Sequence, residues 1–88
     1  MNIKVLGTGC AKCHALEKAV KEVVNELQID ATIEEIKDMK KILEYSILMT
    51  PGLVINEQVV CYGQVPKKEE IEKLITKALE NHEHIKDG

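Results

Sequence analysis

Residues 3–16 read IKVLGTGCAKCHAL and join a short apolar strand, Ile3 to Leu6, to the start of an amphipathic helix. Cys10 and Cys13 stand at this junction, three residues apart. The unpaired N–H groups and the dipole of a helix N-terminus favour an anion, so we expect the first thiol to ionise near neutral pH; the thiolate is the nucleophile of disulfide exchange. An i, i+3 pair in a first helical turn also suits the Cα separation of about 4.4–6.8 Å that a disulfide needs. The pattern therefore predicts reversible thiol chemistry.

Length and charge set limits on the class of protein. The chain has 88 residues, enough for one domain, and 44% of them are apolar, which supplies one modest core. It carries 12 Lys and no Arg against 15 acidic residues, and its only aromatic residues are two Tyr. A net charge of −3 argues against nucleic-acid or membrane partners. The first strand begins almost at residue 1 and leaves no room for a secretory signal, so we expect a cytoplasmic protein.

Hydrophobic periodicity predicts the first helix and the strand that follows it. The apolar positions of the helix follow the i, i+3, i+4, i+7, i+8, i+11 series of one helical face. They are Leu16, Ala19, Val20, Val23, Val24 and Leu27. Residues 31–36 are short and β-branched, which indicates a second strand.

Asp38 is the expected N-cap of a shorter helix that ends near Ser46. Its expected buried side is Met39, Ile42, Leu43 and Ile47. Met49 is expected either to fill a gap in the core or to touch a bound partner.

The second half of the chain predicts a hairpin and a closing helix. Two apolar runs, 53–55 and 59–62, are separated by Asn-Glu-Gln. The last helix has a buried face of Ile71, Leu74, Ile75, Ala78 and Leu79. The apolar period stops at Asn81, so we predict a domain over residues 1–80 and a frayed C-terminal tail over 81–88. The order β-α-β-α-β-β-α is consistent with an α/β fold in which helices cover both faces of a four-stranded sheet.

Three features spread along the chain resemble the thioredoxin family. They are Cys10-Ala11-Lys12-Cys13 at the first strand–helix junction, Thr50-Pro51 before the hairpin, and Gly63 before the last helix. The length and the stretch TPGLVIN, residues 50–56, are similar to the small, glutaredoxin-sized thioredoxin-like redox-active disulfide proteins of archaea and bacteria. The resemblance implies a thioredoxin fold, with a mixed sheet ordered 2-1-3-4 and the third strand antiparallel to the first.

The same resemblance implies roles for individual residues. By the family's pattern Cys10 is the attacking thiol, Cys13 is the resolving thiol, and Pro51 is a cis residue beside them. A cis X–Pro bond exposes the preceding backbone, so we expect Thr50 to pair with an extended substrate segment. Gly63 has no side chain and leaves room for a partner backbone. The expected substrate-binding residues are Met49, Thr50, Pro51 and Gly63.

The chain departs from typical thioredoxins near the cysteines. No Trp precedes Cys10, and Lys4 stands six residues before it, where typical members hold a buried carboxylate that helps to deprotonate the resolving thiol. A different proton acceptor is therefore needed. We expect Lys12 and the helix terminus to lower the pKa of Cys10, and His14 or solvent to assist Cys13.

A metal-binding alternative uses the same pair of thiols. The loop is similar to the Met-x-Cys-x-x-Cys loop of heavy-metal-associated domains, which present two soft thiolates to copper. This chain lacks the methionine, and its predicted order of elements is not the β-α-β-β-α-β order of those domains. Cys61 alternates with Val59 on a predicted strand and is expected to pack in the core.

The sequence thus predicts a monomeric protein dithiol–disulfide oxidoreductase that exchanges a Cys10–Cys13 disulfide with partner proteins. An upstream disulfide reductase is the second expected partner. The exchange itself needs no metal or organic cofactor. A soft-metal module that binds copper or zinc through the same cysteines stays the alternative.

Overall fold

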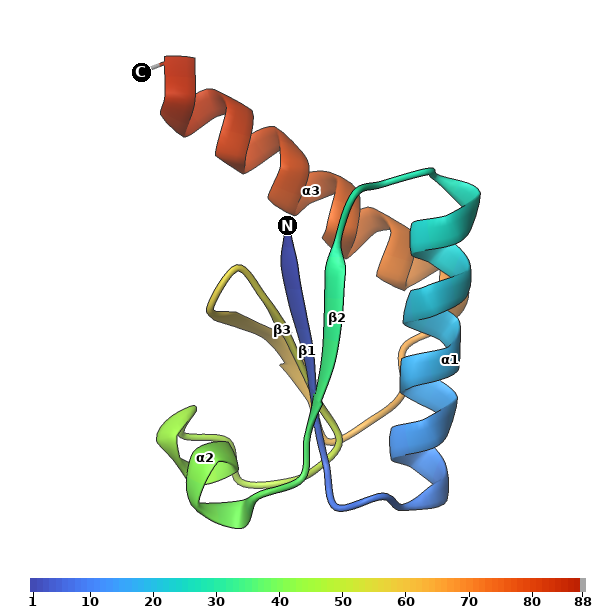
Figure 1. Ribbon diagram of the computed structural model, residues 1–88, viewed down its shortest axis with the longest axis vertical. Helices are drawn as coiled ribbons and strands as arrows, with labels where there is room; N and C mark the ends of the chain where they lie inside the picture. Colours follow the sequence, from blue (N-terminus) through green and yellow to red (C-terminus); the bar gives the residue numbers. More distant parts are fainter. Residues whose placement is uncertain (88) are drawn as a thin grey trace.

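The computed structural model describes the backbone of residues 1–87 and the side chains of residues 1–80. Within that part of the chain the elements follow the predicted order β-α-β-α-β-β-α (Figure 1). They are β1 (Asn2–Leu6), α1 (Ala11–Glu26), β2 (Thr32–Ile36), α2 (Met39–Glu44), β3 (Gly52–Ile55), β4 (Gln58–Tyr62) and α3 (Lys68–Asp87).

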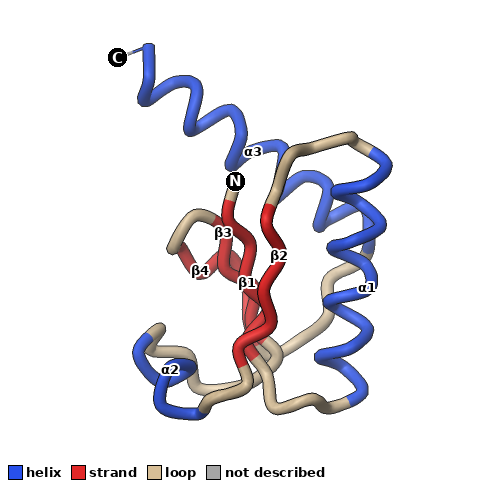
Figure 2. Tube along the Cα trace, viewed as in Figure 1, coloured by secondary structure: helices blue, strands red, loops and turns tan. Residues whose placement is uncertain are grey.

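The strands form one mixed sheet in the order β2-β1-β3-β4 (Figure 2). β1 runs parallel to β2 and antiparallel to β3, and β3 pairs with β4 as an antiparallel hairpin. Asn56 and Glu57 link the hairpin strands with φ values of 50° and 67°. Positive φ at both central residues is the condition for a type I′ turn, whose twist matches that of the strands. The fold class and the predicted strand order are confirmed.

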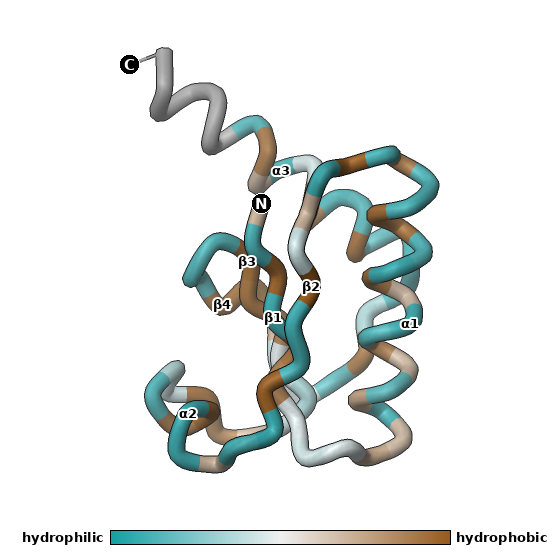
Figure 3. The backbone as a smooth tube through the Cα atoms, in the orientation of Figure 1, coloured by the Kyte–Doolittle hydropathy of each residue, from teal (hydrophilic) through white to brown (hydrophobic). Residues whose placement is uncertain are grey.

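Helices cover both faces of the sheet. α1 and α3 lie on one side and α2 lies on the other (Figure 1), and apolar residues follow the strands and the inner side of α1 (Figure 3). The larger core is formed by Ile3, Val5, Leu16, Val20, Val23, Leu53, Ile55, Ile71 and Ile75. The smaller core, under α2, is formed by Leu6, Ile42, Ile47 and Val54. Alternation along β1 and β3 sends successive side chains to opposite cores, which is why all of β3 is buried.

α1 buries a stripe that begins at a cysteine. Cys13, Leu16, Val20 and Val23 lie within the core at helical spacing. The prediction that Leu27 extends this buried stripe is wrong, because Leu27 is the C-cap residue and is 42% exposed. Its backbone N–H still donates to the carbonyl oxygen of Val23 at 2.9 Å, so Leu27 keeps the helical direction, but it lies past the end of α1 at Glu26.

α2 is shorter and less buried than predicted. Asp38 caps it as expected, because its Oδ1 accepts a hydrogen bond of 2.9 Å from the backbone N–H of Lys40. Only Ile42 is buried within the helix, whereas Met39 and Leu43 are 54% and 63% exposed, so the prediction that both are buried is wrong. A helix of six residues has fewer than two turns, and Ile47, which follows it, completes the smaller core.

α3 packs Ile71 and Ile75 into the larger core. Its backbone remains helical to Asp87, past the residue at which the apolar period stops, and neither Gly nor Pro interrupts residues 68–87. The side chains of 81–87 and residue 88 lie outside the described residues, so the predicted boundary at residue 80 stays a prediction. Among the described helices, none combines the length and the apolar character needed to cross a membrane.

Candidate active site

Cys10 is the N-cap residue of α1. Its backbone is extended, with φ −71° and ψ 167°, and its Sγ accepts a hydrogen bond of 3.4 Å from the backbone N–H of Cys13. The thiol therefore occupies the position that a Ser or Asp side chain takes at most helix N-termini, where unpaired N–H groups favour negative charge. The side chain is exposed and free to meet a partner.

The two thiols shift each other's ionisation in opposite directions. A hydrogen bond from the Cys13 thiol, followed by the bond from the Cys13 backbone N–H, holds the pKa of Cys10 below its ordinary value. Burial, and then the interaction with Cys10, raises the pKa of Cys13. Cys13 is only 1% exposed, and both cysteines are free thiols. One thiol is thus exposed and has a lowered pKa, and the other, one helical turn away, is buried and has a raised pKa.

Lys12 and His14 flank the buried thiol on the exposed side of α1. The group of Lys12 that lowers the pKa of Cys10 is its backbone N–H. His14 donates its backbone N–H to the carbonyl oxygen of Cys10 at 3.1 Å, and its imidazole helps to lower the pKa of Glu35 after Glu17 and Lys37. The tuning roles predicted for the Lys12 and His14 side chains therefore stay predictions.

Lys4 serves the opposite face of the sheet. Its Nζ lies 2.5 Å from Glu57 Oε1 and donates to the Tyr45 hydroxyl at 3.0 Å, and Glu57 is the main reason that its pKa is raised. Alternation along β1 places Lys4 on the side of Leu6 and α2, away from the face that α1 covers. The ammonium is thus paired with Glu57 and Tyr45 on the α2 side of the sheet, and Cys13 lies on the α1 side.

The proline loop and the cysteine loop leave the sheet at the same end. Leu6, the last residue of β1, pairs with Gly52, so the residues on either side of this pair lie close together (Figure 1). The Thr50–Pro51 peptide bond is cis, as the family resemblance implies. The backbone N–H of Gly63 donates to the carbonyl oxygen of Pro51 at 2.8 Å.

Gly63 also lies against Met49. A Cβ at Gly63 would be 3.6 Å from both Cβ and Sδ of Met49. Met49 is 60% exposed, so the prediction that it fills a core gap is wrong. Its neighbour Leu48 is 89% exposed and Tyr62 is 47% exposed. The structure therefore brings Met49, Pro51 and Gly63 together.

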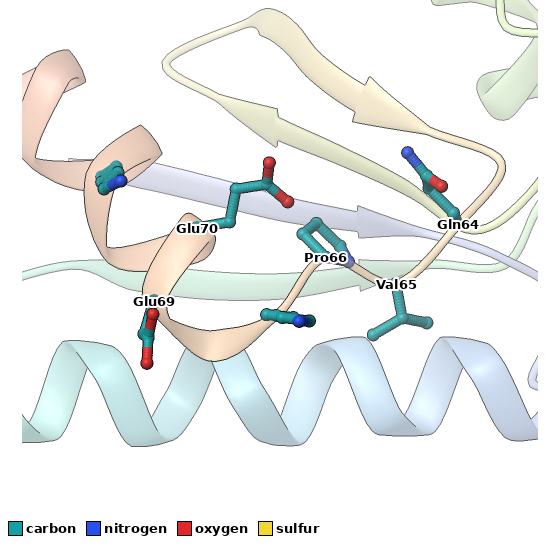
Figure 4. Close-up of a pocket in the computed structure, with 7 residues that line it drawn as sticks. Gln64, Val65, Pro66, Glu69 and Glu70 are labelled. Atoms are coloured by element: carbon teal, nitrogen blue, oxygen red, sulfur yellow. The ribbon is translucent and has the colours of Figure 1, made fainter.

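A separate hollow of about 480 Å³ opens at the start of α3 (Figure 4). Its lining is Gln64, Val65, Pro66, Lys67, Glu69, Glu70 and Lys73. In Figure 4 the Val65 side chain points toward α1, and Gln64 and Glu70 point toward the sheet side. The lining mixes acidic and basic side chains and includes none of the cysteines, so the thiol chemistry lies elsewhere.

Cys61 is half-buried on β4 and packs against the larger core, which agrees with the packing predicted for it. Burial raises its pKa. In the described part of the chain, no three His, Cys, Asp or Glu side chains are grouped to hold a metal ion. The observed order of elements also differs from the β-α-β-β-α-β order of heavy-metal-associated domains.

A pair of unequal thiols at a strand–helix junction, beside a cis-proline loop in this fold, defines a thiol–disulfide oxidoreductase. The family model described as "Thioredoxin domain" matches residues 1–76. The chain therefore belongs to the thioredoxin family.

Curated relatives and solved structures agree with this assignment. The chain is 46% identical over 76 residues to a thioredoxin of Methanothermobacter thermautotrophicus, and the match covers 86% of this chain and 99% of the relative. It is 38% identical over 78 residues to a thioredoxin of Methanocaldococcus jannaschii, covering 89% of this chain and 90% of the relative. The structure of thioredoxin 1 from Thermosipho africanus superposes with a TM-score of 0.62 at 16% identity, covering 94% of this chain and 99% of that one. At that identity the superposition supports the fold alone.

Gly7 is absent from the predicted site, yet it lies against the Cys13 thiol. A Cβ at Gly7 would lie 2.2 Å from Cys13 Sγ. In the sequence Gly7 belongs to the Gly-Thr-Gly turn between the strand and the helix, and nothing there distinguishes a glycine needed for space from one needed for a turn.

Proposed function

We propose that the protein acts as a reductant of disulfides in partner proteins, with Cys10 as the attacking thiol and Cys13 as the resolving thiol. The observation that carries the proposal is the inequality of the two thiols, one exposed with a lowered pKa and one buried with a raised pKa. Only the thiolate attacks a disulfide, so Cys10 reacts first.

The exchange runs in two balanced steps. The Cys10 thiolate attacks one sulfur of the partner disulfide, forms a mixed disulfide and releases the other partner sulfur as a thiolate. Cys13 then gives up its proton and attacks Cys10 Sγ; the Cys10–Cys13 bond forms and the second partner thiolate leaves. The partner gains two electrons, its two thiolates take up protons from the solvent to which Cys10 and Cys13 have released theirs, and the protein is left oxidised. A disulfide reductase must then reduce Cys10–Cys13 to restore the starting state.

We assign partner binding to the surface formed by Met49, Thr50, Pro51 and Gly63. The exposure of Met49, the half-buried position of Thr50 and the absence of a side chain at Gly63 support it. An extended segment laid along this loop would meet backbone at Thr50 and Gly63 and a flexible apolar side chain at Met49. Such contacts suit partners of varied sequence.

Lys12 and His14 complete the proposal as groups that adjust the two thiols. Their place in the first turn of α1, on either side of Cys13 in sequence, supports it. We also propose that the protein works as a monomer in the cytoplasm, where glutathione and related systems keep thiols reduced. Protein disulfides, and not nucleic acid or membrane, are its proposed substrates.

Reduction of insulin disulfides, with dithiothreitol as the final reductant, tests the activity. Wild type is expected to accelerate insulin reduction, and Cys10→Ser to abolish the acceleration while the far-ultraviolet spectrum stays that of a folded protein. Cys61→Ser is the matched control and is expected to retain the activity. Retained activity in Cys10→Ser would refute the assignment, and tight stoichiometric copper(I) or zinc binding by a reduced protein without activity would favour the metal module.

A pair of methionine variants tests the partner-binding surface. Met49 and Met39 are similarly exposed, at 60% and 54%, but Met39 lies on α2. Met49→Ala is expected to raise KM for insulin and leave kcat unchanged, whereas Met39→Ala is expected to change neither. Equal effects of the two substitutions would remove Met49 from the proposed surface.

A further inference from the structure

Gly7 follows the last residue of β1 and remains tied to the sheet. Its backbone N–H donates to the carbonyl oxygen of Ile36 at 2.9 Å, directly after the Leu6↔Ile36 pair. This position therefore cannot shift without breaking the β1–β2 ladder. Alternation along the strand directs the α-carbon substituent of residue 7 to the same side as Ile3 and Val5, which α1 covers.

The resolving thiol fills the space that a side chain at residue 7 would need. A Cβ there would lie 2.2 Å from Cys13 Sγ and 3.0 Å from Cys13 Cβ. Contacts shorter than 3.0 Å do not occur for real Cβ atoms, and a buried Cys13 has little free volume into which it can retreat. The Gly7 backbone thus packs directly against the Cys13 side chain.

Backbone conformation does not explain the glycine at residue 7. Gly9, two residues later in the same loop, has φ +94° and nothing within 4 Å of its hypothetical Cβ. Gly9 is therefore required by its conformation. At Gly7 the φ angle lies outside the left-handed region, and the space that a Cβ would need is occupied by the Cys13 side chain, with its sulfur nearest.

We propose that Gly7 is a positioning residue for the resolving step. Because residue 7 has no side chain, the Cys13 sulfur packs against the end of β1, in the position from which it attacks the mixed disulfide on Cys10. The proposal deepens the dithiol exchange above and rests on it. In that step Cys13 loses its proton to solvent, and its sulfur forms the Cys10–Cys13 bond as the Cys10–partner bond breaks and the partner thiolate leaves. A residue larger than glycine at position 7 pushes the sulfur outward and away from that line.

The test is Gly7→Ala, measured by steady-state insulin reduction. The distance between the added methyl and Cys13 Sγ must grow from 2.2 Å to the 3.4 Å of ordinary contact. A misplacement of about 1 Å lowers the rate of a positioned reaction by up to about a hundredfold. We expect kcat to fall by about tenfold or more while KM is retained, because the substitution leaves the proposed partner-binding loop around Met49 unchanged. The Cys10 mixed disulfide should accumulate, as it does when residue 13 cannot resolve it.

The pH dependence of cysteine alkylation separates a positioning role of Gly7 from a purely structural one, because a purely structural role would leave the pKa values of the two thiols unchanged. In Gly7→Ala the Cys13 sulfur is displaced toward solvent, so its pKa should fall, and the pKa of Cys10 should rise as it loses its hydrogen bond from Cys13. Unchanged profiles together with an unchanged kcat would overturn the proposal.

Stability measurements keep the proposal testable if Gly7→Ala folds poorly. Cys13→Ala removes the sulfur, so Gly7→Ala should lower the urea midpoint much less in the Cys13→Ala background than in wild type. Gly52→Ala is the matched control, because its Cβ meets Ile47 Cδ1 at 2.9 Å and not a cysteine; its effect should be the same in both backgrounds. Equal effects of Gly7→Ala in the two backgrounds would show that the sulfur is not what the glycine accommodates.

The two proposals fail separately. The stability cycle and the alkylation profiles need no partner protein, so they report on Gly7 even if insulin is not reduced. An inactive wild type with the expected cycle would contradict the proposed function alone. An active wild type, together with equal effects of Gly7→Ala in the wild-type and Cys13→Ala backgrounds, would contradict the role of Gly7 alone.

Discussion

Leu16→Ala probes the packing that holds the cysteine turn in place. Leu16 has 0% exposure and lies one turn after Cys13 on the buried side of α1. Truncating a fully buried Leu leaves a cavity, which lowers the free energy of unfolding by about 2–5 kcal/mol. A chain of 88 residues has about 4–13 kcal/mol in total, so we expect a loss of about 3 kcal/mol to lower Tm by about 12–24 °C and leave a protein that still folds at 25 °C.

Leu43→Ala is the matched control for this prediction. The hydrophobic pattern places Leu43 in the core, but the structure leaves it 63% exposed. We therefore expect a change of no more than about 0.5 kcal/mol in its free energy of unfolding. Urea unfolding followed by far-ultraviolet circular dichroism, with equal m-values, measures both variants. Similar losses in the two variants would refute the burial that the structure assigns to α1 and α2.

Three further predictions concern the thiols and one helix cap. Cys13→Ala is expected to raise the pKa of Cys10, because it removes the largest cause of its lowering, whereas Cys13→Ser keeps a hydroxyl donor and should raise it less; the pH dependence of iodoacetamide labelling measures both. Asp38→Ala should lower the free energy of unfolding by about 1 kcal/mol, and Asp38→Asn, which preserves the cap, by less, as read from urea midpoints. At neutral pH the half-buried Cys61 should be labelled more slowly than Cys10, and faster labelling of Cys61 in the folded protein would contradict its placement.

Local patterns account for the part of the fold that could be predicted from the sequence. The apolar series from Leu16, the β-branched strands and the Asp38 cap depend on neighbours within a few residues, and each is found in the structure, except that Leu27 at the end of the series is exposed. The cysteines were placed correctly for the same reason, since the strand–helix junction is itself a local feature. The family resemblance supplied the strand order, which local patterns leave open.

What could not be predicted depends on contacts between distant residues. Lys4 meets Tyr45 and Glu57, which lie 41 and 53 positions away, and no spacing rule connects them. Met39 and Leu43 have helical spacing, but a six-residue helix cannot bury both against the sheet. The closeness of residue 7 to the Cys13 sulfur follows from how α1 docks on β1, which appears only in three dimensions.

Equilibration of the wild-type protein in glutathione redox buffers, followed by alkylation and peptide mass spectrometry, tests the central claim most directly. The account predicts that Cys10 and Cys13 pass together from two alkylated thiols to one intramolecular disulfide over a single transition, while Cys61 stays alkylated throughout. It would be contradicted if Cys10 remained alkylated at every ratio, or if its disulfide partner were Cys61.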